Sequence, residues 1–162
     1  MFSEEYEKPK RKLNPKEAKL KAADFCAYQE RSQQQVRDKL YTYGLYSDDV
    51  EQILSELITE NFINEERFAK AYAGGKFRIK KWGRNKILQG LNQHRVSNYC
   101  IKKAMEEIDE EDYQNTLLEL IASKKSKVTA KDSFTKNRKV AAYLIQKGYE
   151  PTLVWDALKN ED

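Results

Sequence analysis

The segment RNKILQGLNQHRVSNYCIKKAM, residues 84–105, carries the pattern that decides the fold. Its apolar residues lie at offsets of 0, 4, 9, 14 and 18, namely Ile87, Leu91, Val96, Ile101 and Met105. Steps of four keep side chains on one face of a helix, and the wider steps leave space for a turn. The segment therefore predicts two helices joined by a short turn.

The same offsets occur in two further copies. The first copy lies 51 residues earlier, and a shift of 104 residues from that copy leads to the third. The matching residues are Val36, Leu40, Leu45, Val50 and Leu54 in the first copy, and Val140, Leu144, Tyr149, Val154 and Leu158 in the third. A unit of about 50 residues buries little apolar surface alone, so neighbouring units should stack or touch. The pattern predicts an all-α chain of three tandem three-helix repeats, at residues 14–61, 62–109 and 110–162.

Short motifs indicate where individual helices begin. Asn14 precedes a proline and is expected to be an N-cap, with the proline in the first turn. Ser32 and Gln35 have the spacing of a capping box. Ser47 and Asn64 are expected to cap the next two helices.

A basic segment occupies the middle repeat. Residues 67–105 hold 11 basic residues in 39 positions and no acidic residue. Residues 48–66 hold seven acids and no base, and residues 106–112 hold six acids in seven positions. A single charged run can be a solvated helix face. Three alternating blocks indicate instead a local positive field that attracts phosphate or an acidic protein surface.

We expect the binding residues to lie at the centre of this basic segment: Lys76, Arg78, Lys80, Lys81, Trp82, Arg84, Lys86 and Arg95. Trp82 either packs between helices or stacks on a base or a partner residue. Gly83 would leave room at the start of the helix that begins at Arg84, whose free N–H groups would bind an anion. This hypothesis predicts salt-sensitive binding to single-stranded DNA.

Several classes of protein are disfavoured by the composition. The chain is 40% apolar and 35% charged, which is typical of a highly charged helical protein. It has no phosphate-binding glycine motif and no metal-ligand spacing, so we expect no enzyme, no cofactor and no metal. We also expect no membrane span and no secretory signal, and a cytoplasmic monomer with two buried, reduced cysteines. Residues 1–13 are expected to form a flexible basic arm.

Three longer segments carry a family resemblance: FCAYQERSQQQVRDKLYTYGL (25–45), NEERFAKAYAGGKFRIKKWGRNKILQGLNQHRV (64–96) and RKVAAYLIQKGYEPTLVWDALKN (138–160). The chain resembles the RecX family, bacterial regulators of the RecA recombinase. The resemblance implies an elongated, curved array of repeats and a non-enzymatic role in DNA repair, recombination and the SOS response. Such a protein binds the RecA filament on single-stranded DNA and restrains, mainly as an inhibitor, ATP hydrolysis and strand exchange. A helical-repeat protein that acts by contacting nucleic acid is the alternative, and a scaffold for another partner is a third.

The chain departs from the family pattern at two places. The family commonly has glycine where this chain has Arg95, and proline soon after the glycine that matches Gly83, where this chain has Arg84 and Asn85. Arg95 must therefore take an uncommon backbone conformation, or the turn must differ. Both changes add charge to the basic segment and are expected to shift the balance toward DNA contact.

Overall fold

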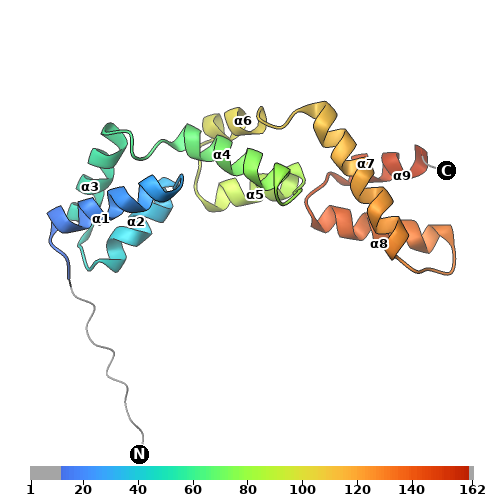
Figure 1. Cartoon of the computed structure of the whole chain (residues 1–162), viewed down its shortest axis with the longest axis horizontal. Helices are drawn as coiled ribbons and strands as arrows, with labels where there is room; N and C mark the ends of the chain where they lie inside the picture. Colours follow the sequence, from blue (N-terminus) through green and yellow to red (C-terminus); the bar gives the residue numbers. More distant parts are fainter. Residues whose placement is uncertain (1–11, 161–162) are drawn as a thin grey trace, which may run out of the picture. The chain divides into compact units, whose positions relative to one another are not determined.

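The computed structural model describes residues 12–160, and the regular secondary structure of this range is entirely helical (Figure 1). The predicted all-α class is therefore confirmed. The helices form three successive groups of three: α1 (Pro15–Tyr28), α2 (Gln33–Thr42), α3 (Ser47–Thr59), α4 (Glu65–Arg78), α5 (Arg84–Gln93), α6 (Asn98–Met105), α7 (Glu110–Lys127), α8 (Ser133–Gln146) and α9 (Pro151–Asn160).

The described residues separate into two compact units, residues 12–68 and 69–160, and the boundary lies within α4. The predicted repeat boundaries, at 61/62 and 109/110, fall in the connections before α4 and α7. The exact division into repeats remains a prediction. None of the helices within residues 12–160 has the length and apolar character needed to cross a membrane.

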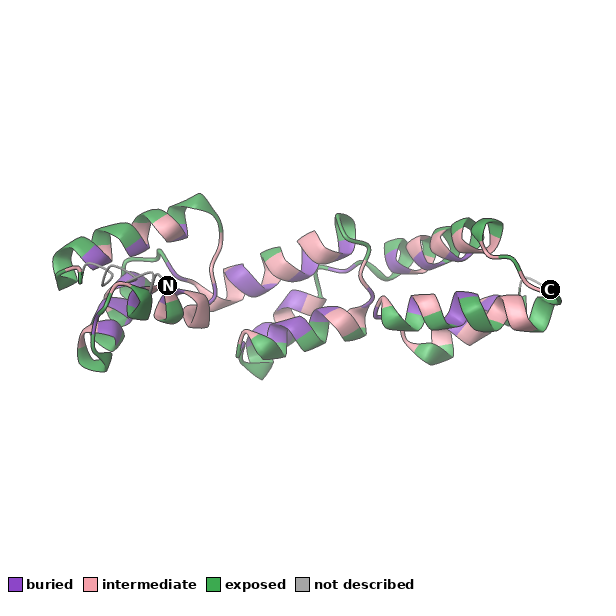
Figure 2. Cartoon of the chain, turned by 90° about the horizontal axis from the view of Figure 1, so that it is seen from below, coloured by how far each residue is buried: buried purple, intermediate pink, exposed green. Residues whose placement is uncertain are grey.

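The apolar core of the first unit lies among α1, α2 and α3. Ala18 and Ala22 of α1 are fully buried, and their small side chains let the other two helices approach closely. In Figure 2 the buried positions are confined to part of each helix surface, as expected for amphipathic helices.

Two of the predicted N-caps in this unit are confirmed. The Asn14 side chain accepts a hydrogen bond from the Glu17 N–H at 2.8 Å, and Ser32 and Gln35 form both bonds of a capping box. The expectation for Ser47 is wrong by one residue. Tyr46 occupies the N-cap position, because its carbonyl accepts the first helical hydrogen bond, from the Val50 N–H at 3.0 Å. Its side chain makes no capping hydrogen bond.

The internal repeat is confirmed by burial and by backbone conformation. Of the fifteen positions in the three copies, fourteen are buried and Met105 is half-buried. The residues that follow α2, α5 and α8 at equivalent positions all have positive φ: Gly44 at 83°, Arg95 at 58° and Gly148 at 109°. Arg95 therefore keeps the turn of the other two copies and adopts a left-handed conformation that is unfavourable for a residue with a Cβ atom.

The predicted basic arm falls largely outside the described residues, which exclude residues 1–11. Of its two described residues, Leu13 donates its N–H to the Tyr43 carbonyl at 3.0 Å. The Lys12 ammonium lies 4.2 Å from the centre of the Tyr46 ring. These two residues are thus attached to the turn between α2 and α3.

Candidate partner-binding surface

Tyr72 of α4 reaches Gly90 of α5. A Cβ atom at Gly90 would lie 2.0 Å from the Tyr72 hydroxyl oxygen, so a larger residue here would force the Tyr72 side chain to move. The His94 ring meets Tyr72 edge-on, with ring centroids 5.4 Å apart. Burial lowers the pKa of His94, and the nearby charge of Lys76 lowers it further. Tyr72 of α4 thus contacts both Gly90 of α5 and His94, the residue at the end of α5.

Trp82 connects α4 and α5 and is contacted by cations of this same chain. The ammonium groups of Lys76 and Lys86 lie 4.8 Å and 4.4 Å from the centre of its ring, and the ring is half-buried. Of the two interpretations of Trp82, this arrangement favours packing between helices, because the chain itself supplies partners for the ring.

The end of α4 presents a group of exposed cations. Lys81 has φ of 57°, and its N–H donates to the Phe77 carbonyl at 3.0 Å, which ends the helix. Arg78, Lys80 and Lys81 are exposed. Ile79, which lies among them, is 78% exposed. We call these four residues the α4 tip. Cations are favourable here because a helix carries partial negative charge at its C-terminus.

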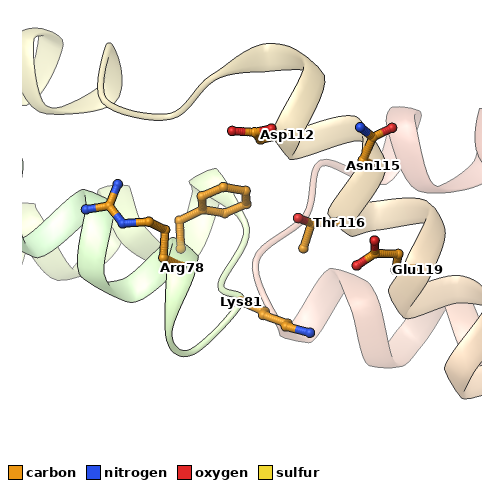
Figure 3. A pocket seen from close by; sticks show the side chains of 7 residues that line it. Arg78, Lys81, Asp112, Asn115, Thr116 and Glu119 are labelled. Atoms are coloured by element: carbon orange, nitrogen blue, oxygen red, sulfur yellow. The ribbon is translucent and has the colours of Figure 1, made fainter.

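A cleft adjoins the α4 tip and contains residues of both charges (Figure 3). It has a volume of about 340 Å³ and is lined by Phe77, Arg78, Lys81, Asp112, Asn115, Thr116 and Glu119. The last four of these residues come from α7. The basic and acidic blocks of the sequence thus meet at one place in the second unit.

Gly83 lies against the backbone of the third helix group. A Cβ atom at Gly83 would be 2.2 Å from the Gly148 carbonyl carbon and from the Tyr149 nitrogen. The Gly83 N–H donates to the Lys147 carbonyl at 3.0 Å, and the Asn85 N–H donates to the Gly148 carbonyl at 2.9 Å. The space that Gly83 was expected to leave for an anion is filled by the chain. The predicted anion site at the start of α5 is therefore wrong.

Two buried tyrosines complete this contact between α5 and the third group. The Tyr113 hydroxyl accepts the Arg84 N–H at 3.1 Å and donates to the Glu150 carboxylate. Burial, reinforced by the bond to Glu150, raises the pKa of Tyr113 far above its usual value. The Tyr149 ring stacks on Tyr113, with centroids 5.2 Å apart, and its hydroxyl donates to the Lys81 carbonyl at 2.9 Å.

The Arg84 side chain belongs to the same contact. Its guanidinium pairs with Glu110 at 2.9 Å and with Glu150 at 3.1 Å, and it lies 3.9 Å from the centre of the Tyr113 ring. Hydrogen bonds from Gln114 and Arg84 lower the pKa of Glu110. We call this region the joint; its residues are Gly83, Arg84, Tyr113, Gly148, Tyr149 and Glu150. The family pattern suggests proline at position 84 or 85. Proline at either position would destabilise this contact, because the N–H groups of residues 84 and 85 both donate hydrogen bonds.

Comparison with known proteins identifies the family of this chain. Three family models match in order: the first three-helix domain of RecX at residues 18–57, the second at 64–105 and the third at 110–158. The chain belongs to the RecX family. A protein named regulatory protein RecX from Clostridium perfringens strain 13 is 31% identical over 123 residues, which cover 74% of this chain and 57% of the relative. A RecX from Amycolatopsis mediterranei is 24% identical over 157 residues, covering 94% of this chain and 90% of the relative.

Solved RecX structures share the fold. The crystal structure of RecX from Lactobacillus salivarius has a TM-score of 0.80 at 18% identity, covering 90% of this chain and 95% of that one. A second structure, titled regulatory protein RecX, has a TM-score of 0.81 at 21% identity and covers 90% and 73% of the two chains. The chain spans only 57%, 56%, 61% and 62% of four Clostridium RecX proteins that it matches.

In this RecX-family chain, the eight predicted binding residues have different surroundings. Lys76 and Lys86 contact Trp82, and Arg84 lies in the joint. Arg78, Lys80 and Lys81 are together at the α4 tip, whereas Arg95 is exposed at the turn between α5 and α6. Ile79 was not among the predicted residues, although an isoleucine between Arg78 and Lys80 that belongs to no copy of the repeat is visible in the sequence.

Proposed function

We propose that this chain regulates RecA by binding the RecA filament on single-stranded DNA and restraining ATP hydrolysis and strand exchange. Its membership of the RecX family supports this proposal, as does the name of its relatives, regulatory proteins. In this proposal the chain acts as a monomer in the cytoplasm by protein contact, without chemistry of its own.

The α4 tip is the observation that carries the proposal to particular residues. Within residues 12–160, Arg78, Lys80 and Lys81 form no ion pair, so their charges are available to a partner. Ile79 supplies an exposed apolar contact among them, and the adjoining cleft supplies Asp112 and Glu119. A surface that combines an apolar contact with charges of both signs fits a protein partner better than it fits a uniform phosphate chain.

The proposal is tested by measuring RecA ATPase activity on single-stranded DNA while this protein is titrated in, at two salt concentrations. We expect inhibition at fewer than one copy per RecA. A chain with normal helicity that gives no inhibition at one copy per RecA would contradict the proposal for the RecA used.

A matched pair of variants locates the contact. Arg78→Glu with Lys80→Glu changes two exposed cations of the α4 tip, and Lys16→Glu with Lys21→Glu changes two exposed cations of α1 by the same charge. We expect the first variant to need about tenfold more protein for half-inhibition, corresponding to about 1.4 kcal/mol, and the second to act like the parent. Equal losses in both variants would indicate that only net charge matters.

A further inference from the structure

The third helix group contains a hairpin that extends beyond the repeat. A shift of 104 residues places α2 on residues 137–146, so residues 133–136 of α8 form an added turn. Superposing the N-caps Asn64 and Asp109 places α4 on residues 110–123. Residues 124–127 of α7 therefore form a second added turn. Residues 124–136 thus contain two added helical turns, eight residues in all, on either side of a loop where α7 ends and α8 begins (Figure 1).

This extension contributes nothing to the core. The buried residues of α7 end at Ile121, and those of α8 begin at Val140. All residues from 122 to 139 are half-buried or exposed. Ordering such a segment costs conformational entropy that burial of apolar surface does not offset, so its sequence is explained better by an external contact than by packing.

Basic residues dominate the extension and the turn that follows it: Lys124, Lys125, Lys127, Lys131, Lys136, Arg138 and Lys139. The one acid between residues 124 and 139 is Asp132, and its carboxylate caps α8 by accepting the Thr135 N–H at 2.7 Å. Lys127, Lys131 and Arg138 are exposed and form no ion pair within residues 12–160. Lys127, Lys131 and Arg138 therefore give the hairpin a positive field that no ion pair within residues 12–160 offsets at these three side chains.

An exposed aromatic ring and a shallow hollow both belong to this hairpin. Phe134 is 68% exposed, and the Arg138 guanidinium lies 5.8 Å from the centre of its ring. A hollow of about 620 Å³ is lined by Thr129, Ala130, Lys131, Thr135 and Lys139. The Lys139 ammonium donates to the Thr129 carbonyl at 3.1 Å, which holds the loop and this cation together.

We propose that the α7–α8 hairpin is a separate binding site for single-stranded nucleic acid, with the lysines on the sugar-phosphate backbone and Phe134 stacked on a base. Cations beside an accessible aromatic ring are the combination by which proteins hold single strands without reading sequence. Threonine hydroxyls add hydrogen-bond donors suited to phosphate oxygens. Between residues 124 and 139 the one carboxylate is Asp132, which already accepts the Thr135 N–H. This site requires no RecA and lies apart from the α4 tip, so it goes beyond the function proposed above.

The phosphate contacts are tested by fluorescence anisotropy with a labelled oligothymidylate across a range of salt concentrations, in the absence of RecA. Lys127→Gln with Lys131→Gln removes two exposed cations, and Lys16→Gln with Lys21→Gln is the control. We expect the slope of log affinity against log salt to decrease in magnitude by about 0.7 for each lysine lost at the hairpin. The slope and affinity of the control should be those of the parent. A hairpin variant that behaves like the parent would overturn the proposal.

Phe134→Ala tests the stacking contact, with Phe134→Tyr as the variant that keeps a ring. We expect the alanine variant to bind the oligothymidylate about tenfold more weakly and a DNA duplex as well as the parent does, while the tyrosine variant retains single-strand binding. An unchanged affinity in the alanine variant would overturn the assignment. Displacement of the oligonucleotide by polyglutamate at equal charge concentration would also overturn it, in favour of an acidic protein partner. The assay contains no RecA, so its failure leaves the ATPase test of the α4 tip unaffected.

Discussion

The joint and the α4 tip come from the same basic segment, yet their charged residues have different environments. At the joint, Arg84 pairs with Glu110 and Glu150 and covers Tyr113. At the α4 tip, Arg78 and Lys80 are exposed and form no ion pair within residues 12–160. The comparison teaches that a count of basic residues locates a region but does not separate charges that stabilise the fold from charges that are available to a partner.

The cause of this difference is the backbone around Gly83. The absence of a side chain at Gly83 lets Gly148 and Tyr149 approach the start of α5, where carbonyl groups accept its N–H groups. This approach also brings Glu150 within 3.1 Å of the Arg84 side chain. Two residues before Gly83, the left-handed Lys81 ends α4 and leaves its last cations in solvent.

The largest effect is expected from closing the space at Gly83. Gly83→Ala would place a Cβ atom 2.2 Å from backbone atoms of residues 148 and 149, and we expect a loss of about 3 kcal/mol in the free energy of unfolding. Gly75→Ala is the control, because a Cβ atom at Gly75 has no neighbour within 4 Å and alanine favours a helix by up to about 1 kcal/mol. Urea unfolding measures both. Similar stabilities for the two variants would show that the joint is not tightly packed.

An intermediate effect is expected from removing one hydroxyl group of the joint. Tyr113→Phe leaves the Arg84 N–H and the buried side of Glu150 without their shared partner, and we expect a loss of about 2 kcal/mol. Tyr143→Phe serves as the control, because Tyr143 is half-buried and its ring is contacted by Lys124 rather than joined to the helix groups by hydrogen bonds. A loss in the control as large as in Tyr113→Phe would contradict this role of the hydroxyl.

The smallest effect concerns Arg95, which lies in neither region. Arg95→Gly should relieve the left-handed conformation and raise stability by about 0.5 kcal/mol, after the extra freedom of glycine in the unfolded chain is counted. Arg95→Ala removes the charge but keeps the unfavourable conformation, so it should leave stability unchanged. Thermal melting of the two variants distinguishes strain from charge. If alanine stabilises as much as glycine, the effect comes from charge repulsion.

Much of the fold follows from local sequence, because apolar spacing and caps act over a few residues. The offsets around Ile87 located the helix pairs of all three groups, and Asn14, Ser32 and Asn64 marked three N-termini correctly. Whether Arg95 takes an uncommon conformation or the turn differs could be decided only from the structure. The tertiary packing that outweighs the strain at Arg95 is not local in sequence.

The candidate site was less predictable for the same reason. Whether the N–H groups of α5 are free depends on Lys147 and Gly148, which lie more than 60 residues away in sequence. Arg84 and Lys80 look alike in sequence, and only the position of Glu110 and Glu150 separates them. α7 continues through Lys127 because no glycine or proline interrupts it.

One measurement tests the central claim most directly: binding of a RecA filament on single-stranded DNA by Arg84→Ala and by Arg78→Glu with Lys80→Glu, each paired with urea unfolding of the same sample. The account predicts opposite outcomes. Arg84→Ala should be less stable by about 1–2 kcal/mol, yet the folded protein should bind like the parent. The double variant should keep its stability to within about 1 kcal/mol and bind about tenfold more weakly. If Arg84→Ala remains folded and binds as weakly as the double variant, the joint is part of the partner surface and the distinction between the two regions is wrong.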